Sequence, residues 1–255
     1  MEPFVGSMGI CEDFLIDCLG LKNTLDDTEI KNIWINDKDY GIACLWTSVL
    51  KYPDELKNLV RGFTPSVDAF HYIKNILLTT DYLNRADKDN IVSFGFNKLA
   101  IHQISYSGLG TMSGGPLGGK EQKSDYKIDC RWSPEYLIKQ IDELHELFSC
   151  FKFEEDRCTS YDFQTMIENN FKKYLLYCDP PYYMKGEELY QYSFTEQDHI
   201  RLSELLQNTN HVWLLSYDDC PRIRELYDWA NIEEVKVNYT INGSNTKQEL
   251  LISKG

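Results

Sequence analysis

Residues 173–183 join an apolar strand to a turn that can continue neither as a strand nor as a helix. The stretch Lys173–Cys178 predicts a buried strand that ends at Asp179, and Pro180 and Pro181 follow directly. Consecutive prolines fix the backbone and lack N–H donors, so the carbonyl oxygens near them point outward as acceptors. In open α/β sheets, ligands bind at the carboxyl ends of the strands. The segment therefore predicts an α/β fold with a functional carboxylate at the edge of the sheet.

The residues of this turn suit a planar ring that carries an amino group. Asp179 and the Pro180 carbonyl can each accept one N–H of that amine, which draws the lone pair out of conjugation with the ring. Tyr182 can stack on the face of the ring. The amine can then attack a methyl sulfonium without prior deprotonation. The alternative is a purely structural turn with a stacked tyrosine.

The rest of the chain alternates predicted helices and strands. We expect strands over residues 33–36, 211–217, 235–241 and 249–252, and helices over residues 12–18, 40–51, 54–60, 133–148 and 195–206. Asn242-Gly243 is a hairpin turn signal. The pattern predicts a mostly parallel sheet with helices, finished by a C-terminal antiparallel hairpin.

The segment from Gly95 to Arg131 interrupts this alternation. Within it, Ser105–Gly119 contains six glycines and a proline, which can sustain neither a helix nor a central strand. The interleaved Tyr106, Leu109 and Met112 argue against a plain linker. Long loops in compact domains are usually functional or disordered, so we expect a loop that contacts a ligand.

A second glycine motif opens the chain. Gly6 and Gly9 form a Gly-x-x-Gly turn that leads into the first predicted helix, where a backbone can approach a ligand closely. Asp37 ends the next predicted strand and can accept hydrogen bonds from a ribose diol. Together they predict a nucleoside-containing cofactor, either a dinucleotide or S-adenosylmethionine. A helix N-cap is the alternative for Asp37.

The turn Glu2-Pro-Phe-Val-Gly-Ser-Met-Gly9 and the motif Asp179-Pro-Pro-Tyr182 resemble the cofactor and catalytic motifs of Dam-type DNA adenine-N6 methyltransferases. The order is also similar: cofactor turn, inserted target-recognition region, catalytic motif. The resemblance continues at Ser193–His199, at Leu214–Asp219 and at Thr246–Ile252, and it covers essentially the whole chain. The Asp-Pro-Pro-Tyr motif is highly specific for amino methyltransferases.

This resemblance implies a site-specific enzyme that transfers a methyl group from S-adenosylmethionine to the N6 amino group of adenine in duplex DNA. The implied fold is a class I methyltransferase α/β sandwich over residues 1–45 and 132–255, with a helical and loop target-recognition insert over residues 46–131. The implied catalytic residues are Asp179, Pro180, Pro181 and Tyr182. The implied cofactor-binding residues are Glu2, Phe4, Gly6, Gly9, Asp37 and, at the end of an expected strand, Asp162 and Phe163.

The charge balance constrains how DNA binds. The chain carries a net charge of −14, so its basic residues must gather on one face. Lys98–Trp132 holds five basic against three acidic residues. The expected DNA-binding residues are Gln103, Tyr106, Ser107, Leu109, Lys120, Lys123, Lys127 and Arg131. Members that read GATC use an arginine where this chain has Thr111, so the resemblance does not predict GATC recognition by that route.

Other features of the sequence narrow the setting. The eight cysteines are scattered and form no Cys-x-x-Cys pair, so we expect reduced thiols in a cytoplasmic protein and no metal site. No apolar run approaches the roughly 20 residues of a membrane span, and the N-terminus does not resemble a signal peptide. A cognate restriction enzyme is a candidate partner.

Three other interpretations stay open at this point. A nicotinamide-dependent oxidoreductase would share the glycine turn but not the Asp-Pro-Pro-Tyr motif. An RNA or other amino methyltransferase would share the motif, and a catalytically impaired fragment would act only as a DNA-binding module. We also expect the chain to lack an N-terminal segment, because no strand and no Gly-Gly-Lys-like segment precede the turn at Glu2.

Overall fold

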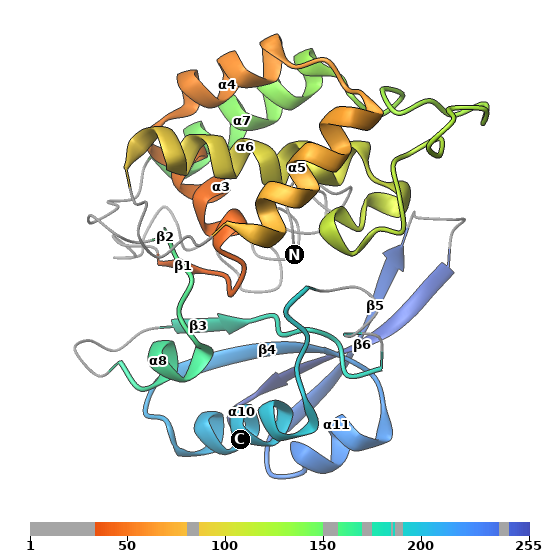
Figure 1. Cartoon of the computed structure of the whole chain (residues 1–255). Coiled ribbons are helices and arrows are strands. Elements are labelled where there is room, and N and C mark those ends of the chain that lie inside the picture. The colour runs from red at the N-terminus through yellow and green to blue at the C-terminus, as the bar shows by residue number, and fades with distance from the viewer. Residues whose placement is uncertain are drawn as a thin grey trace. The chain divides into compact units, whose positions relative to one another are not determined.

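A computed structural model describes residues 34–80, 87–149, 158–169, 175–184, 186, 191–239 and 245–255. The chain divides into two compact units, Met1–Ser160 and Tyr161–Gly255 (Figure 1). The predicted cofactor residues Glu2, Phe4, Gly6 and Gly9 lie outside the described residues, as do the helix expected over residues 12–18 and the turn signal Asn242-Gly243.

The first unit is mainly helical. Its elements are β1 (Ile35–Asn36), α3 (Tyr40–Lys51), α4 (Pro53–Gly62), α5 (Val67–Thr79), α6 (Lys88–Ile104), α7 (Pro134–Ser149) and β2 (Cys158–Thr159). The short strands β1 and β2 pair in parallel. Helix α6 is buried over most of its length, with Val92, Leu99, Ile101 and Ile104 among its buried residues, so it forms the centre of this unit.

Gly95 lies inside α6, so the expectation that the helical pattern breaks at this residue is wrong. A Cβ atom on Gly95 would come within 2.8 Å of the Cys44 carbonyl oxygen and the Leu45 Cα atom of α3. The glycine therefore lets α3 and α6 approach closely and does not begin a loop. The irregular segment starts ten residues later, at Ser105, where α6 has ended.

Three predicted helices of this unit are confirmed, together with their first turns. Helix α3 begins after Asp39, whose carboxylate accepts the Gly41 N–H at 2.8 Å. Helix α4 has Pro53 in its first turn, and α7 begins at Pro134. The Ser133 hydroxyl oxygen accepts the Tyr136 N–H at 3.4 Å, as expected for the residue that caps α7.

The compact units divide the chain at a different place from the predicted domains. Helix α7 lies in the predicted catalytic part, yet its residues Leu137 and Ile141 share a hydrophobic core with α3, α4 and α6. The boundary between the units falls after Ser160. The functional division into residues 1–45 and 132–255 against 46–131 stays a prediction.

The second unit contains a four-stranded sheet in the order β3-β4-β6-β5. Its elements are α8 (Phe163–Ile167), β3 (Leu175–Cys178), α10 (Glu196–Asn208), β4 (Val212–Asp218), α11 (Pro221–Leu226), β5 (Asn231–Tyr239) and β6 (Asn245–Ser253). Strands β3 and β4 are parallel, whereas β6 is antiparallel to both β4 and β5. The C-terminal hairpin is confirmed, but over the described strands this sheet is mixed and not mostly parallel, because the hairpin contributes two of its strands.

One face of this sheet carries the core of the second unit. Trp213, Leu215 and Tyr217 alternate along β4 and are buried, as are Leu250 and Ile252 on β6. Helices α10 and α11 lie along the sheet (Figure 1), and the same cluster includes their buried residues Leu202, Leu206 and Ile223.

The start of α10 confirms a predicted cap. Thr195 and Asp198 form a capping box, in which each side chain accepts the backbone N–H of the other residue. Two N–H groups that the first turn of a helix would leave without partners are thereby satisfied. The start of α10 is thus set by its own local sequence.

A buried ion pair in the first unit provides a test of its packing. Lys98 Nζ lies 2.6 Å from Asp39 Oδ2, and the side chains are only 4% and 17% exposed. Replacing Lys98 by Met leaves a poorly hydrated carboxylate at the start of α3. We expect Lys98→Met to lower the free energy of unfolding by about 3–5 kcal/mol, measured by chemical denaturation.

The matched control is Lys139→Met on α7, because Lys139 is 72% exposed and pairs with Glu143 across one helical turn. Exposed ion pairs contribute little, so this variant should resemble the unchanged protein. Equal losses from the two substitutions would contradict a special role for the buried pair.

Candidate active site

The structure places Asp179 directly after β3, at the start of a segment that we call the motif loop, residues 179–184. Strand β4 runs parallel to β3, with Cys178 opposite Leu215, and ends at Asp218. The carboxyl ends of parallel strands meet at the same edge of a sheet. The motif loop therefore begins at the edge where the sequence predicted a functional carboxylate.

A serine on the neighbouring strand holds the Asp179 side chain. The Ser216 hydroxyl donates to Asp179 Oδ1 at 2.8 Å, and the Tyr177 hydroxyl donates to Ser216 Oγ at 3.2 Å. The chain of hydrogen bonds thus runs from β3 to β4 and back to the residue that follows β3. Such a chain restricts the orientation of the carboxylate.

The backbone of the motif loop is held by Asp218. Its carboxylate accepts the Tyr183 N–H at 2.8 Å and the Met184 N–H at 3.0 Å. Pro180 and Pro181 offer no N–H groups, so the first donors beyond Tyr182 are the ones that Asp218 binds. The loop is consequently fixed at its start by β3 and near its end by β4.

The Tyr182 side chain makes a third contact with the sheet. Its hydroxyl donates to Glu249 Oε1 of β6 at 2.6 Å. No sequence pattern singled out Ser216, Asp218 or Glu249 as individual site residues. The available signal was that they lie in the segments Leu214–Asp219 and Thr246–Ile252, in which the sequence resembles the methyltransferase family.

The predicted cofactor residues Asp162 and Phe163 begin a helix and do not end a strand. Strand β2 ends at Thr159, and Asp162 is the N-cap of α8, where its carboxylate accepts the Gln164 N–H at 2.9 Å. The strand end at these two residues was implied by the family resemblance alone, and the local sequence instead caps a helix there.

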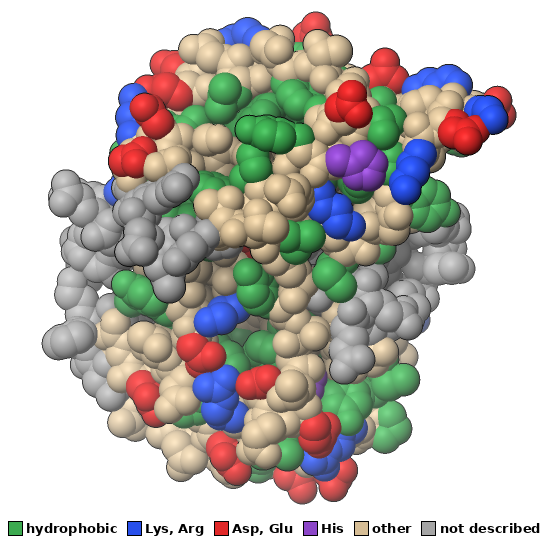
Figure 2. Space-filling view, in the orientation of Figure 1, with side chains coloured by type: hydrophobic (Ala, Val, Ile, Leu, Met, Phe, Trp, Pro, Cys, Tyr) green, Lys and Arg blue, Asp and Glu red, His purple; other side chains and the backbone are tan. Residues whose placement is uncertain are grey.

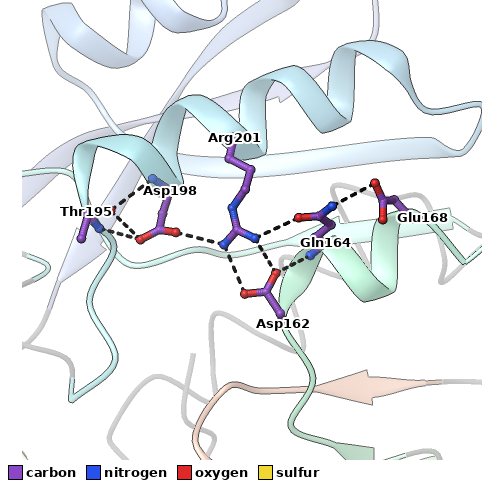
Figure 3. A network of polar contacts seen from close by, with 6 residues as sticks. All are labelled: Asp162, Gln164, Glu168, Thr195, Asp198 and Arg201. Atoms are coloured by element: carbon purple, nitrogen blue, oxygen red, sulfur yellow. Dashed lines mark hydrogen bonds and ion pairs between the residues drawn. The ribbon is translucent and has the colours of Figure 1, made fainter.

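Arg201 of α10 ties this residue pair to the rest of the second unit (Figure 3). Its two terminal nitrogens lie 2.9 and 3.2 Å from the Asp162 oxygens, and one of them also donates to Asp198 at 2.9 Å. The guanidinium lies 4.2 Å from the centre of the Phe163 ring. Hydrogen bonding to Asp162 is the main cause that raises the pKa of Arg201 above its usual range, so the network keeps its charge.

Asp37 belongs to the first unit. Its backbone N–H donates to the Thr159 carbonyl at 3.0 Å, and its Oδ1 accepts the Asp39 N–H at 2.7 Å. The N-cap of α3 is Asp39, so the capping alternative for Asp37 does not hold. A role for Asp37 in binding a ribose stays a prediction.

The glycine-rich segment after α6 is an irregular loop, as predicted. It contains two short 3₁₀ turns, Tyr106–Gly108 and Gly110–Met112. Ser113 Oγ lies 3.1 Å from the Tyr106 carbonyl oxygen and 2.7 Å from that of Gly115, so its hydroxyl can donate to either side of the loop and holds the two sides together. A pocket of about 420 Å³ opens between Tyr106, residues 114–119, Ser124 and Tyr126.

The side chains of this loop differ in how far they reach solvent. Tyr106 is 63% exposed and Ser107 is exposed, whereas Leu109 is half-buried. Thr111, at the position where the resemblance implies an arginine in GATC-reading members, is only 5% exposed. Which residues of this loop read a base stays a prediction. Gln103, on α6, is half-buried.

The predicted DNA-binding basic residues Lys120, Lys123, Lys127 and Arg131 are all exposed. Lys123 pairs with Glu121, and Lys127 donates to the Gln122 carbonyl. Lys98 was counted in the basic stretch, but it is buried against Asp39 and cannot contribute to a surface. On the face shown in Figure 2, acidic and basic side chains are interspersed and form no continuous block of one sign among the residues drawn in colour.

Residues 125–241 match the family model of the D12 class N6 adenine-specific DNA methyltransferases. The matched region includes the motif loop, Asp162 and Arg201. No curated protein matches the chain. Residues 125–241 thus form a D12 class N6 adenine-specific DNA methyltransferase domain, and the activity of this family is methylation of adenine in DNA. The family implies the use of S-adenosylmethionine and a DNA substrate.

Across the described residues, no helix has the length and apolar character that crossing a membrane requires. The described cysteines form no disulfide: Cys44 and Cys220 are buried, Cys158 and Cys178 are half-buried, and Cys130 is exposed. Burial raises the pKa of the Cys178 thiol to about 12, so this neighbour of Asp179 stays protonated and uncharged.

A buried histidine packs against the motif loop. His199 of α10 is 3% exposed, its ring centre is 4.9 Å from that of Tyr183, and its Nδ1 shares a hydrogen bond with the Tyr217 hydroxyl. Burial lowers the pKa of His199 below the usual value of 6.5, although the acidic residues Glu196, Asp218 and Asp198 act in the opposite direction.

We expect nuclear magnetic resonance titration of the His199 ring protons to give a pKa below 6.5, because the folded protein disfavours the charged imidazole. The unfolded chain then binds the proton more readily. The contribution of His199 to stability is therefore present above a pH of about 6.5 and is lost as the pH falls below it. A measured pKa at or above 6.5 would contradict this effect of burial.

Proposed function

We propose that the motif loop is the catalytic centre for adenine methylation. Asp179 and the Pro180 carbonyl accept the two N–H groups of the target amine, Pro181 keeps the loop rigid, and Tyr182 stacks on the base. The observation that carries this proposal is the hydrogen bond from Ser216 to Asp179, which orients a half-buried carboxylate at the edge of the sheet. The hold of Asp218 on the following backbone supports the same assignment.

The chemistry follows from these acceptors. S-adenosylmethionine supplies the methyl group as a sulfonium. The amine nitrogen forms its bond to the methyl carbon while the sulfur–carbon bond breaks, and the nitrogen becomes positive. The negative charge of Asp179 stabilises that developing charge, and the excess proton leaves by way of this carboxylate to water. Holding amine and methyl group in line supplies much of the remaining rate enhancement.

The side chains proposed for the cofactor fit its chemistry. Asp37 offers a carboxylate for a ribose diol, and Asp162 and Phe163 offer a carboxylate and an aromatic ring for an adenine. The Asp162 side chain is 37% exposed while it binds Arg201, so it is both oriented and accessible. By resemblance, the proposed set is completed by Glu2, Phe4, Gly6 and Gly9.

We infer that the exposed loop of the first unit meets duplex DNA. Phosphates would be contacted by Lys120, Lys123, Lys127 and Arg131, and the residues near the bases would be Gln103, Tyr106, Ser107 and Leu109. The target adenine must leave the duplex to reach Asp179, which costs roughly a few kcal/mol. A cytoplasmic location and a cognate restriction enzyme belong to this proposal as predictions.

Replacing Asp179 by Ala tests the catalytic assignment. We expect loss of methyl transfer with cofactor binding largely retained, because the carboxylate orients the amine and not the methyl donor. Transfer of tritium from labelled cofactor to DNA measures turnover, and calorimetry measures cofactor affinity.

Asp228→Ala is a matched control, since Asp228 is an exposed acid of the same unit outside the motif loop and the DNA-binding loop. RNA and protein serve as alternative acceptors in the same assay. Wild-type turnover by Asp179→Ala would refute the assignment, and transfer to RNA instead of DNA would favour the other amino methyltransferase interpretation.

Replacing the four basic loop residues together tests the DNA face. Affinity for DNA falls as the salt concentration rises. Each lost phosphate contact should make the slope of log affinity against log salt concentration less negative by about 0.9. Glutamine variants of Lys120, Lys123, Lys127 and Arg131 should therefore bind DNA more weakly and with a flatter salt dependence.

The control replaces the same number of exposed basic residues outside the loop, Lys51, Lys88, Lys139 and Lys236. Binding is measured by fluorescence anisotropy with labelled duplex DNA over a range of salt concentrations. A larger change of slope in the control variant would place the phosphate-contacting face elsewhere.

A further inference from the structure

We propose that Glu249 is a positioning residue for Tyr182, the residue that stacks on the target base. Its carboxylate accepts the Tyr182 hydroxyl at 2.6 Å and thereby fixes the position of the far end of the ring. This inference rests on the proposed function of the motif loop, because it concerns the ring that this function assigns to the base.

Strand register places Glu249 beside the groups that hold the motif loop. Glu249 lies opposite Asp218 in the pairing of β4 with β6, and Ser216 lies opposite Leu251. Residues opposite one another, and residues two apart on one strand, share a face of the sheet. Ser216, Asp218 and Glu249 therefore lie on one face, and the other face carries the buried residues Leu215, Tyr217 and Leu250.

The strand that carries Glu249 is a rigid support. Strand β6 is hydrogen-bonded to β4 on one side and to β5 on the other, and Glu249 has a partner in both, Asp218 and Val235. A side chain on such a strand is held more precisely than one on a loop. The sheet therefore holds the Glu249 carboxylate in place, and the carboxylate in turn holds the Tyr182 hydroxyl.

The Tyr182 ring needs this support at its far end. Pro180 and Pro181 restrict the backbone before it, and Asp218 binds the N–H groups of Tyr183 and Met184 after it. These contacts fix the backbone at Tyr182 but leave the torsions of its side chain free. The hydrogen bond at the hydroxyl restricts the first torsion, which sets the direction of the ring, so the ring is positioned before the base arrives.

The experiment compares Glu249→Ala, Glu249→Gln, Tyr182→Phe and the double variant Tyr182→Phe with Glu249→Ala. Steady-state methylation of genomic DNA that lacks adenine methylation gives kcat and KM, and calorimetry gives cofactor affinity. Glu233→Ala is the matched control: Glu233 lies opposite Leu251, on the same face as Glu249, and is exposed. Thermal unfolding verifies that each variant is folded.

We expect Glu249→Ala and Tyr182→Phe each to lower kcat/KM for DNA about tenfold or more, the scale of one hydrogen bond to a charged group. Cofactor affinity should not change. The double variant should be no worse than either single variant, because both remove the same hydrogen bond. Glu249→Gln keeps an acceptor oxygen and should recover most of the activity.

Three results would overturn the inference. They are additive losses in the double variant, a Glu249→Gln variant as impaired as Glu249→Ala, and a Glu249→Ala variant no different from Glu233→Ala. If Glu249→Ala does not fold, Tyr182→Phe and Glu249→Gln still decide. Asp179→Ala separates the two proposals: wild-type turnover there refutes the proposed function, whereas loss there with normal Glu249 variants refutes only this inference.

Discussion

The pairing register between β4 and β6 is the constraint on which the proposed site depends. It sets Asp218 opposite Glu249 and brings Ser216 to the same face. The motif loop cannot hold itself, because Pro180 and Pro181 have no N–H groups to donate. Its orientation is instead supplied by side chains from two strands that are distant from it in sequence.

The same register determines the core of the second unit. Trp213, Leu215 and Tyr217 are buried on one face of β4, while Ser216 and Asp218 face the other way. A slip of one residue would turn the apolar set outward and carry the polar set into the core. The packing that favours this register also aligns the groups around Asp179. A change that shifts the register would therefore cost stability and would disturb the site as well.

Charged residues in the two units are used in different ways. Arg201 joins α8 to α10 through Asp162 and Asp198 and remains partly exposed, so this network can orient a carboxylate that is still accessible. Lys98 is buried with Asp39 and serves the packing of α3 on α6. A count of basic residues along the sequence cannot separate these uses, because it contains no information on burial.

The sequence by itself determined the local elements and the nature of the chemistry. Apolar periodicity, Pro134 and Thr195 predicted α7 and α10, and Asp179-Pro-Pro-Tyr182 indicated an amino methyltransferase, because these signals act over neighbouring residues. Only the tertiary structure decided that Gly95 lies inside a helix, that Thr111 is buried and that Glu249 meets Tyr182. Each of these depends on contacts between residues far apart in the chain, and such contacts leave no periodic trace in the sequence.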